Sequence, residues 1–163
     1  MGHGFSHVGL STLDMDATIR FYRDVLGFPQ VVEEVTEVLE GGTLRQAYFD
    51  IGGGQYIVFM EPMNVPGIPD DFDAGINGAL GLPGGMYHFA FRVPSIEELE
   101  QKRRHLADHG FDVSDVIDLD TAKSIFLSDP NGVQIEFSCH VRAFDAADMT
   151  RRNQASVALP EAE

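Results

Sequence analysis

An internal repeat is the feature that most constrains what this chain can fold into. Each half contains a strand, an amphipathic helix and then three strands, so two β-α-β-β-β units follow one another. In the first half the opening strand is predicted at residues 5–10, and in the second at 86–93. The six following strands are predicted at about 30–38, 44–51 and 55–60, and at 113–119, 123–128 and 133–138.

Both predicted helices have clear ends. In the first, Met15, Ile19, Tyr22 and Leu26 recur at three- and four-residue steps, and Gly27 stands where a left-handed cap belongs. The second starts at the Ser-x-x-Glu capping box of residues 95–98 and runs to Gly110. The sequence therefore predicts an α+β fold of two βαβββ modules.

The 163 residues suit one domain made of two similar halves. We expect this single domain at residues 1–141, with module 1 at about 5–61 and module 2 at about 86–140. A Pro- and Gly-rich loop at 62–85 links the modules, and a loop of this length can cover a pocket. Residues 142–163 are expected to form a C-terminal tail with a short helix at best.

Superposing the halves pairs residues that carry chemistry. His7 falls on His88, and matching the hairpins by length places Phe59 where the second half has Glu136. Strand alternation puts Glu136 on the face opposite Ile135 and Phe137. A carboxylate inside a sheet requires a partner, because an isolated buried charge is costly.

These segments resemble the vicinal oxygen chelate superfamily, which includes glyoxalases, bleomycin resistance proteins and extradiol dioxygenases. The resemblance covers residues 5–140 and is carried by four strings: His-Val-Gly-Leu at 7–10, F-Y-x-x-V-L-G-F at 21–28, His-Phe-Ala-Phe at 88–91, and D-P-x-G-x-x-I-E-F at 129–137. It implies two modules whose sheets curl around one divalent metal, with ligands His7, His88 and Glu136. Fe(II) is favoured, and Mn, Zn or Ni are alternatives.

The number of protein ligands to the metal distinguishes the reactions known in this superfamily. Glyoxalase I-type relatives have a fourth protein ligand where this chain has Phe59, whose ring cannot coordinate a metal. A register slip that brings in Glu61 would keep a glyoxalase-like lyase or isomerase open. Three ligands are the set that extradiol dioxygenases use with Fe(II), so an extradiol-dioxygenase-like enzyme is favoured.

The resemblance to dioxygenases is incomplete. Those enzymes typically have a tyrosine where this chain has Phe126, and they carry further pocket histidines. His140 shares strand parity with Glu136 and is the spare histidine that can enter the pocket; with Glu61 it is our candidate for acid/base work. Phe59 and Phe126 are the candidate lining of a pocket for an apolar or aromatic small molecule. A non-catalytic small-molecule binding or resistance protein is the third alternative.

Charge and cysteine content narrow the partners. The 26 acidic residues outnumber the 11 Lys and Arg, and the formal net charge is −15, which disfavours nucleic acid and anionic membrane surfaces. The single cysteine, the absence of a long apolar run and the absence of a signal-like N-terminus favour the cytoplasm. Because many small relatives pair, we also expect a homodimer.

Overall fold

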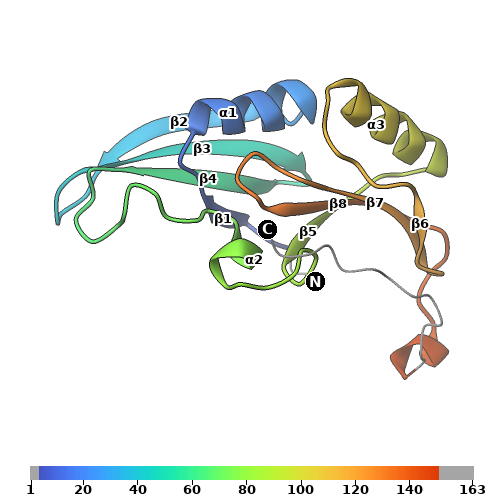
Figure 1. The fold of residues 1–163 in the computed structure, drawn as a ribbon. Helices are drawn as coiled ribbons and strands as arrows, with labels where there is room; N and C mark the ends of the chain where they lie inside the picture. Colours follow the sequence, from blue (N-terminus) through green and yellow to red (C-terminus); the bar gives the residue numbers. More distant parts are fainter. Residues whose placement is uncertain (1–3, 151–163) are drawn as a thin grey trace. The chain divides into compact units, whose positions relative to one another are not determined.

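The computed structural model describes residues 4–150, which form two compact units. The first unit comprises residues 4–81 together with 129–133, and the second comprises 82–128 together with 134–150. Each unit has one four-stranded mixed sheet with a helix over one face (Figure 1). The predicted α+β fold of two βαβββ modules is confirmed.

The sheet of the first unit has the order β1-β4-β3-β2. β1 is parallel to β4, and the other neighbours are antiparallel. All four strands lie where the sequence predicts them, and β4 is three residues longer than expected. Their bounds are β1 (His7–Ser11), β2 (Gln30–Glu37), β3 (Thr43–Gly52) and β4 (Gln55–Met63).

The first helix changes its winding halfway. It starts as α1 (Met15–Ile19) and continues as a π-helical turn, η1 (Arg20–Val25). The Asp14 carboxylate caps its start by accepting a hydrogen bond from Ala17 N at 2.8 Å. Phe21 and Tyr22, neighbours in the wider π-helical turn, are both buried. Gly27 ends the helix with φ 78°, the predicted left-handed cap.

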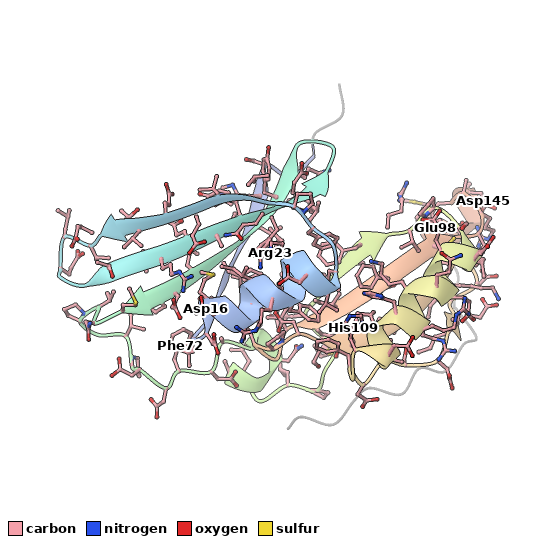
Figure 2. All side chains as sticks on the ribbon, turned by 90° about the horizontal axis from the view of Figure 1, so that it is seen from above. Asp16, Arg23, Phe72, Glu98, His109 and Asp145 are labelled. Carbon is pink, nitrogen blue, oxygen red and sulfur yellow. The ribbon has the colours of Figure 1, made fainter. Side chains whose placement is uncertain are left out.

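The second unit repeats this topology, with the order β5-β8-β7-β6 and β5 parallel to β8. Helix α3 (Ile96–Asp108) lies over its sheet, and Ser95 Oγ accepts a hydrogen bond from Glu98 N at 3.1 Å, as the capping signature predicts. Figure 2 shows Glu98 near the start of α3 and His109 beyond its last turn. The strands are β5 (His88–Arg92), β6 (Ile117–Asp118), β7 (Ala122–Ser128) and β8 (Gln134–His140).

The strand predicted at 113–119 is mostly absent, since β6 has only two residues. Ser114 explains the difference. Phe126 N donates to the Ser114 hydroxyl at 3.0 Å, while Ser114 N donates to Phe126 O at 2.9 Å. A side chain therefore takes the place of one backbone partner, and the regular ladder does not extend through this segment.

The linker and the tail also contain short elements. Within 62–85 the chain forms α2 (Ile76–Ala79), and after β8 it forms the 3₁₀ turn η2 (Ala146–Met149), within the part of the chain where the sequence predicts a short helix at best. The rest of the predicted tail, 151–163, lies outside the described residues. Within residues 4–150, no helix is long and apolar enough to cross a membrane.

A buried polar network fastens segment 129–133, which connects β7 to β8 in sequence but packs in the first unit. Tyr22 Oη donates to Asp129 Oδ2 at 3.0 Å, and Thr12 Oγ1 donates to Asn131 Oδ1 at 2.6 Å. The Asp129 carboxylate also accepts from Asn131 N and Val133 N, both at 2.8 Å. Burial raises the pKa of Asp129 although these donors oppose the shift, and burial followed by the Asp129 charge raises the pKa of Tyr22.

Tyr22→Phe should lower the free energy of unfolding by about 2 kcal/mol, because a buried carboxylate loses a donor. The pKa of Asp129 is raised in the native protein, so the protonated carboxyl group stabilises the fold fully below the ordinary aspartate range. This contribution declines as pH rises through the native pKa. The hydroxyl favours the charged carboxylate, so the loss should be larger near pH ~7 than near pH ~4. Urea unfolding at both pH values measures it.

Tyr56→Phe is the matched control, because the Tyr56 ring is partly exposed and lies on β4 of the same unit. It should leave the unfolding free energy nearly unchanged. Equal losses for the two variants, or a Tyr22→Phe loss that is the same at both pH values, would contradict the assigned role of the network.

Candidate metal centre

His88 and Glu136 meet on one face of the second unit's sheet. His88 opens β5, Glu136 lies in the middle of β8, and the parallel register places the small Ala90 directly beside Glu136. The His88 Nε2 and Glu136 Oε2 atoms are 3.2 Å apart. Two of the three predicted metal ligands are thus in contact.

The contact of His88 Nδ1 with the backbone shows which ring nitrogen carries a hydrogen. Nδ1 lies 2.8 Å from the carbonyl oxygen of Gly85, and because a carbonyl can only accept, Nδ1 carries the hydrogen. In a neutral ring, the Nε2 lone pair then faces a carboxylate oxygen. Two acceptors at this distance require a cation or a proton between them. Metal-binding histidines usually donate their second N–H in this way, so the donor set fits a divalent metal.

Glu136 is 7% exposed and is held by serines. Ser124 Oγ donates to Glu136 Oε1 at 2.6 Å, and Ser124 also lies 3.0 Å from Ser138 Oγ. One carboxylate oxygen is therefore satisfied by a hydroxyl while the other faces His88. This arrangement partners the buried carboxylate and fixes its direction.

His7 belongs to the first unit. Like His88 in its own module, it is the first residue of the first strand, and it is exposed. Its Nδ1 lies 3.4 Å from Ser6 Oγ, and its ring lies 6.4 Å from that of Tyr48. Neither unit by itself gathers three His, Cys, Asp or Glu side chains as a metal site among residues 4–150. The ligand set of His7, His88 and Glu136 draws on both units and stays a prediction.

The strand registers correct the repeat alignment by one residue. His88 pairs with Gln134, two residues before Glu136, and His7 pairs with Tyr56, two residues before Val58. Val58, not Phe59, therefore occupies the place of Glu136. Matching by length misses this because a two-residue turn with a register shift joins β3 to β4, whereas five residues join β7 to β8.

Phe59 and Glu61 lie on the helix-covered side of the first sheet, opposite the expected pocket. Phe59 is fully buried, with its ring 4.7 Å from that of Tyr22, so it is a core residue and not a pocket residue. Glu61 Oε1 accepts from Met15 N at 3.1 Å, and Oε2 lies 3.7 Å from Arg45 Nη1. The carboxylate binds the start of α1, and the pairing of β1 with β4 does not show the register slip that would bring Glu61 toward His7.

Phe126 lies beside the His88–Glu136 pair. It is the antiparallel partner of Glu136 on β7, and its ring stands nearly perpendicular to that of His88 with centroids 6.5 Å apart. The side chain is partly exposed. This placement suits the predicted pocket lining, which stays a prediction.

A cavity of about 320 Å³, here called the Glu136 cavity, opens on this face of the second unit. His140 lines it, but as the fourth residue after Glu136 on the same strand it lies roughly 13 Å farther along. Sequence reasoning missed Arg92, although it shares the alternation of His88. The lining consists of Ala90, Arg92, Leu119, Thr121, Ala122, Glu136, Ser138, His140 and Phe144.

Comparisons with known proteins agree with this fold. The sequence pattern of the Glyoxalase/Bleomycin resistance protein/Dioxygenase superfamily matches residues 4–137. An iron-dependent extradiol dioxygenase of Rhodococcus jostii is 26% identical over 96% of this chain and 49% of its own length. A catechol-2,3-dioxygenase of Bacillus subtilis is 28% identical over 82% of this chain and 41% of its own length. The chain therefore spans less than half of each of these relatives.

Solved structures support the fold alone at their level of identity. A glyoxalase/bleomycin resistance protein/dioxygenase domain from Frankia has a TM-score of 0.68 at 22% identity and covers 88% of this chain and 96% of its own. A lactoylglutathione lyase from Agrobacterium tumefaciens has a TM-score of 0.57 at 23% identity, with 85% and 94% covered. With most of its length matched by the family pattern and its two βαβββ modules in place, the chain belongs to the Glyoxalase/Bleomycin resistance protein/Dioxygenase superfamily.

Proposed function

We propose that this protein is a metal-dependent enzyme that acts on a small molecule chelated through adjacent oxygens, as an extradiol dioxygenase does. The observation that carries the proposal is the His88–Glu136 contact, with Nδ1 of His88 committed to Gly85 O and Nε2 turned toward the carboxylate. Names of relatives that include an iron-dependent extradiol dioxygenase support Fe(II) as the metal.

His88 Nε2, Glu136 Oε2 and His7 would hold the ion. When bound, Fe(II) would polarise the oxygens of a diol and supply one-electron chemistry toward dioxygen. The Gly85 carbonyl keeps the imidazole oriented, and Ser124 keeps one carboxylate oxygen occupied so that the other stays directed at the centre. Phe126 would bound the space beside the ring of His88.

The first unit favours three ligands over the four of a glyoxalase-like lyase. Val58 at the position equivalent to Glu136 is an apolar side chain, and Glu61 is engaged by Met15 N and Arg45. A four-ligand site would require a further donor near His7. We therefore place the dioxygenase ahead of the lyase. The proposal also includes a homodimer in the cytoplasm.

His140 is assigned to the outer part of the substrate. A separation of roughly 13 Å along β8 keeps its imidazole away from atoms bound between His88 and Glu136. Geometry comes before pKa in choosing an acid or base, so we do not give His140 the proton transfer at the reacting carbon.

Protein purified without oxygen should contain about one iron per chain. His88→Ala and Glu136→Gln should each remove most of this iron, because the facial triad loses a ligand. Elemental analysis measures the metal. His109→Ala is the matched control, since this exposed histidine caps the end of α3 and its ring contacts His105. It should retain full metal content.

Stoichiometric zinc or nickel lost on the same substitutions would favour the lyase. No metal above background in the unsubstituted protein would leave a small-molecule binding protein and end both enzyme proposals.

Ser124→Ala should weaken metal affinity about 10-fold while the protein stays folded, because the hydroxyl orients a ligand without binding the ion itself. Competition with a coloured chelator measures the affinity. Ser128→Ala on the same strand is the control, because Ser128 is exposed and pairs with Gln134 at the far side of Glu136. Equal affinity in the two variants would argue against Ser124 as a positioning residue.

Iron-loaded protein should consume one oxygen molecule for each catechol cleaved, and His88→Ala should reduce that rate by at least about 100-fold, since the ligand set is broken. An oxygen electrode with a panel of substituted catechols measures the reaction. Absence of uptake from a sample with full iron content would contradict ring cleavage.

A further inference from the structure

We infer that the Glu136 cavity selects a substrate that carries a carboxylate on its substituent, bound by Arg92 with His140 alongside. This inference rests on the proposed function, because it names the substrate class of the same site. The metal end would hold the chelating oxygens, and the Arg92 end would hold the anion. The Arg92 end lies within the second unit, as do the ligands His88 and Glu136 of the metal end.

The strand register sets the spacing between the two ends. On β5, His88, Ala90 and Arg92 share one face, and their β8 partners are Gln134, Glu136 and Ser138. Arg92 is two residues past Ala90, so its Cα lies roughly 7 Å farther along the strand than that of Ala90. A ring bound beside Ala90 therefore places a short substituent within reach of the guanidinium.

Glu136 does not neutralise Arg92. Ala90 lies directly beside Glu136, so His88 and Arg92 are both diagonal neighbours of the carboxylate. The carboxylate uses its oxygens for His88 at 3.2 Å and for Ser124 at 2.6 Å. Glu136 and Arg92 therefore form no ion pair, although both line the cavity.

Arg92 differs from most cations of this acidic chain. With 26 acidic residues available to 11 Lys and Arg, carboxylates are plentiful, and Arg45, Lys123 and Arg142 each have one within 3.0 Å. The side chain of Arg92, like that of Arg20 outside the cavity, has no ion pair or hydrogen bond in the part of the chain that the structure describes. A cavity-lining arginine without a carboxylate partner is the donor that a ligand carboxylate pairs with bidentately.

The segment after β8 completes the wall on this side. Arg142 binds Asp148 through two bonds of 2.7 and 2.8 Å and Asp120 at 3.0 Å, so the segment is tied down and the charge of Arg142 is used internally. Phe144 then stands edge-on to His140, with centroids 5.5 Å apart. A second hollow, of about 510 Å³, shares Arg92, His140 and Phe144, so the opening continues past the guanidinium.

Charge and size favour a monoanion on a small aromatic body. The single positive charge of Arg92 balances a monoanion, but it does not balance a dianion such as phosphate in a chain of net charge −15. Thr121 and Ser138 add hydroxyls, while Ala90, Leu119 and Phe144 supply apolar contact. The volume of about 320 Å³ matches one ring with a short side chain.

Three probes separate the two ends of the site. 3,4-Dihydroxyphenylacetate carries both the diol and the carboxylate, 4-methylcatechol only the diol, and phenylacetate only the carboxylate. Calorimetry would measure their binding to wild type and to Arg92→Gln, with and without iron. We expect Arg92→Gln to weaken both carboxylate probes about 10- to 100-fold and to leave 4-methylcatechol within about 2-fold. His140→Gln should give a smaller loss in the same direction.

Arg20→Gln is the control, because it removes the same charge from an exposed position on η1 outside the cavity. It should leave all three affinities unchanged. Equal losses in Arg20→Gln and Arg92→Gln, or equal losses for the carboxylate and neutral probes, would overturn the inference.

Phenylacetate binding to metal-free protein reports the anion end alone, and 4-methylcatechol binding to iron-loaded protein reports the metal end alone. Failure of the first overturns this inference, whereas failure of the second overturns the proposed function.

Discussion

The parallel register between β5 and β8 is the constraint on which the site depends. It places Ala90 beside Glu136, so that the carboxylate is flanked diagonally by His88 on one side and Arg92 on the other. A shift of one residue would turn Glu136 into the helix-covered face, where Phe137 packs, and would leave a charge in the core. The contact of His88 with Glu136 and the placement of Arg92 near the same carboxylate both follow from this one pairing.

Much of this arrangement was predictable from the sequence because it depends on alternation along a strand. The period of two places Glu136 opposite Ile135 and Phe137, and the repeat singles out His7 and His88. The alignment of Phe59 with Glu136 was wrong because equal hairpin lengths conceal different turns, and only the hydrogen-bond register identifies Val58. The Ser114 contact was beyond prediction, since a side chain replaces a backbone partner on a segment twelve residues away, and the alternation along a strand does not indicate such a bond.

The acidity of the chain has a different meaning at the site than on the surface as a whole. An excess of carboxylates makes long-range attraction of an anion unfavourable, yet the same excess makes a cation without a carboxylate partner informative. The charge of Arg92 is available to a ligand in the cavity, because Glu136 pairs with His88 and Ser124 and not with Arg92. Selection at short range can therefore operate against an unfavourable overall field, at the expense of the association rate.

The repeat shows that the two modules carry different side chains at equivalent positions. With His7 placed on His88, the first-unit equivalents of Ala90, Arg92 and Glu136 are Gly9, Ser11 and Val58. The backbone pairing is the same, but Val58 replaces the carboxylate in the first module, while the second module has Glu136, the supporting Ser124 and Arg92. Two copies of one topology thus carry different chemistry, because strand pairing fixes the positions and side chains decide what each position does.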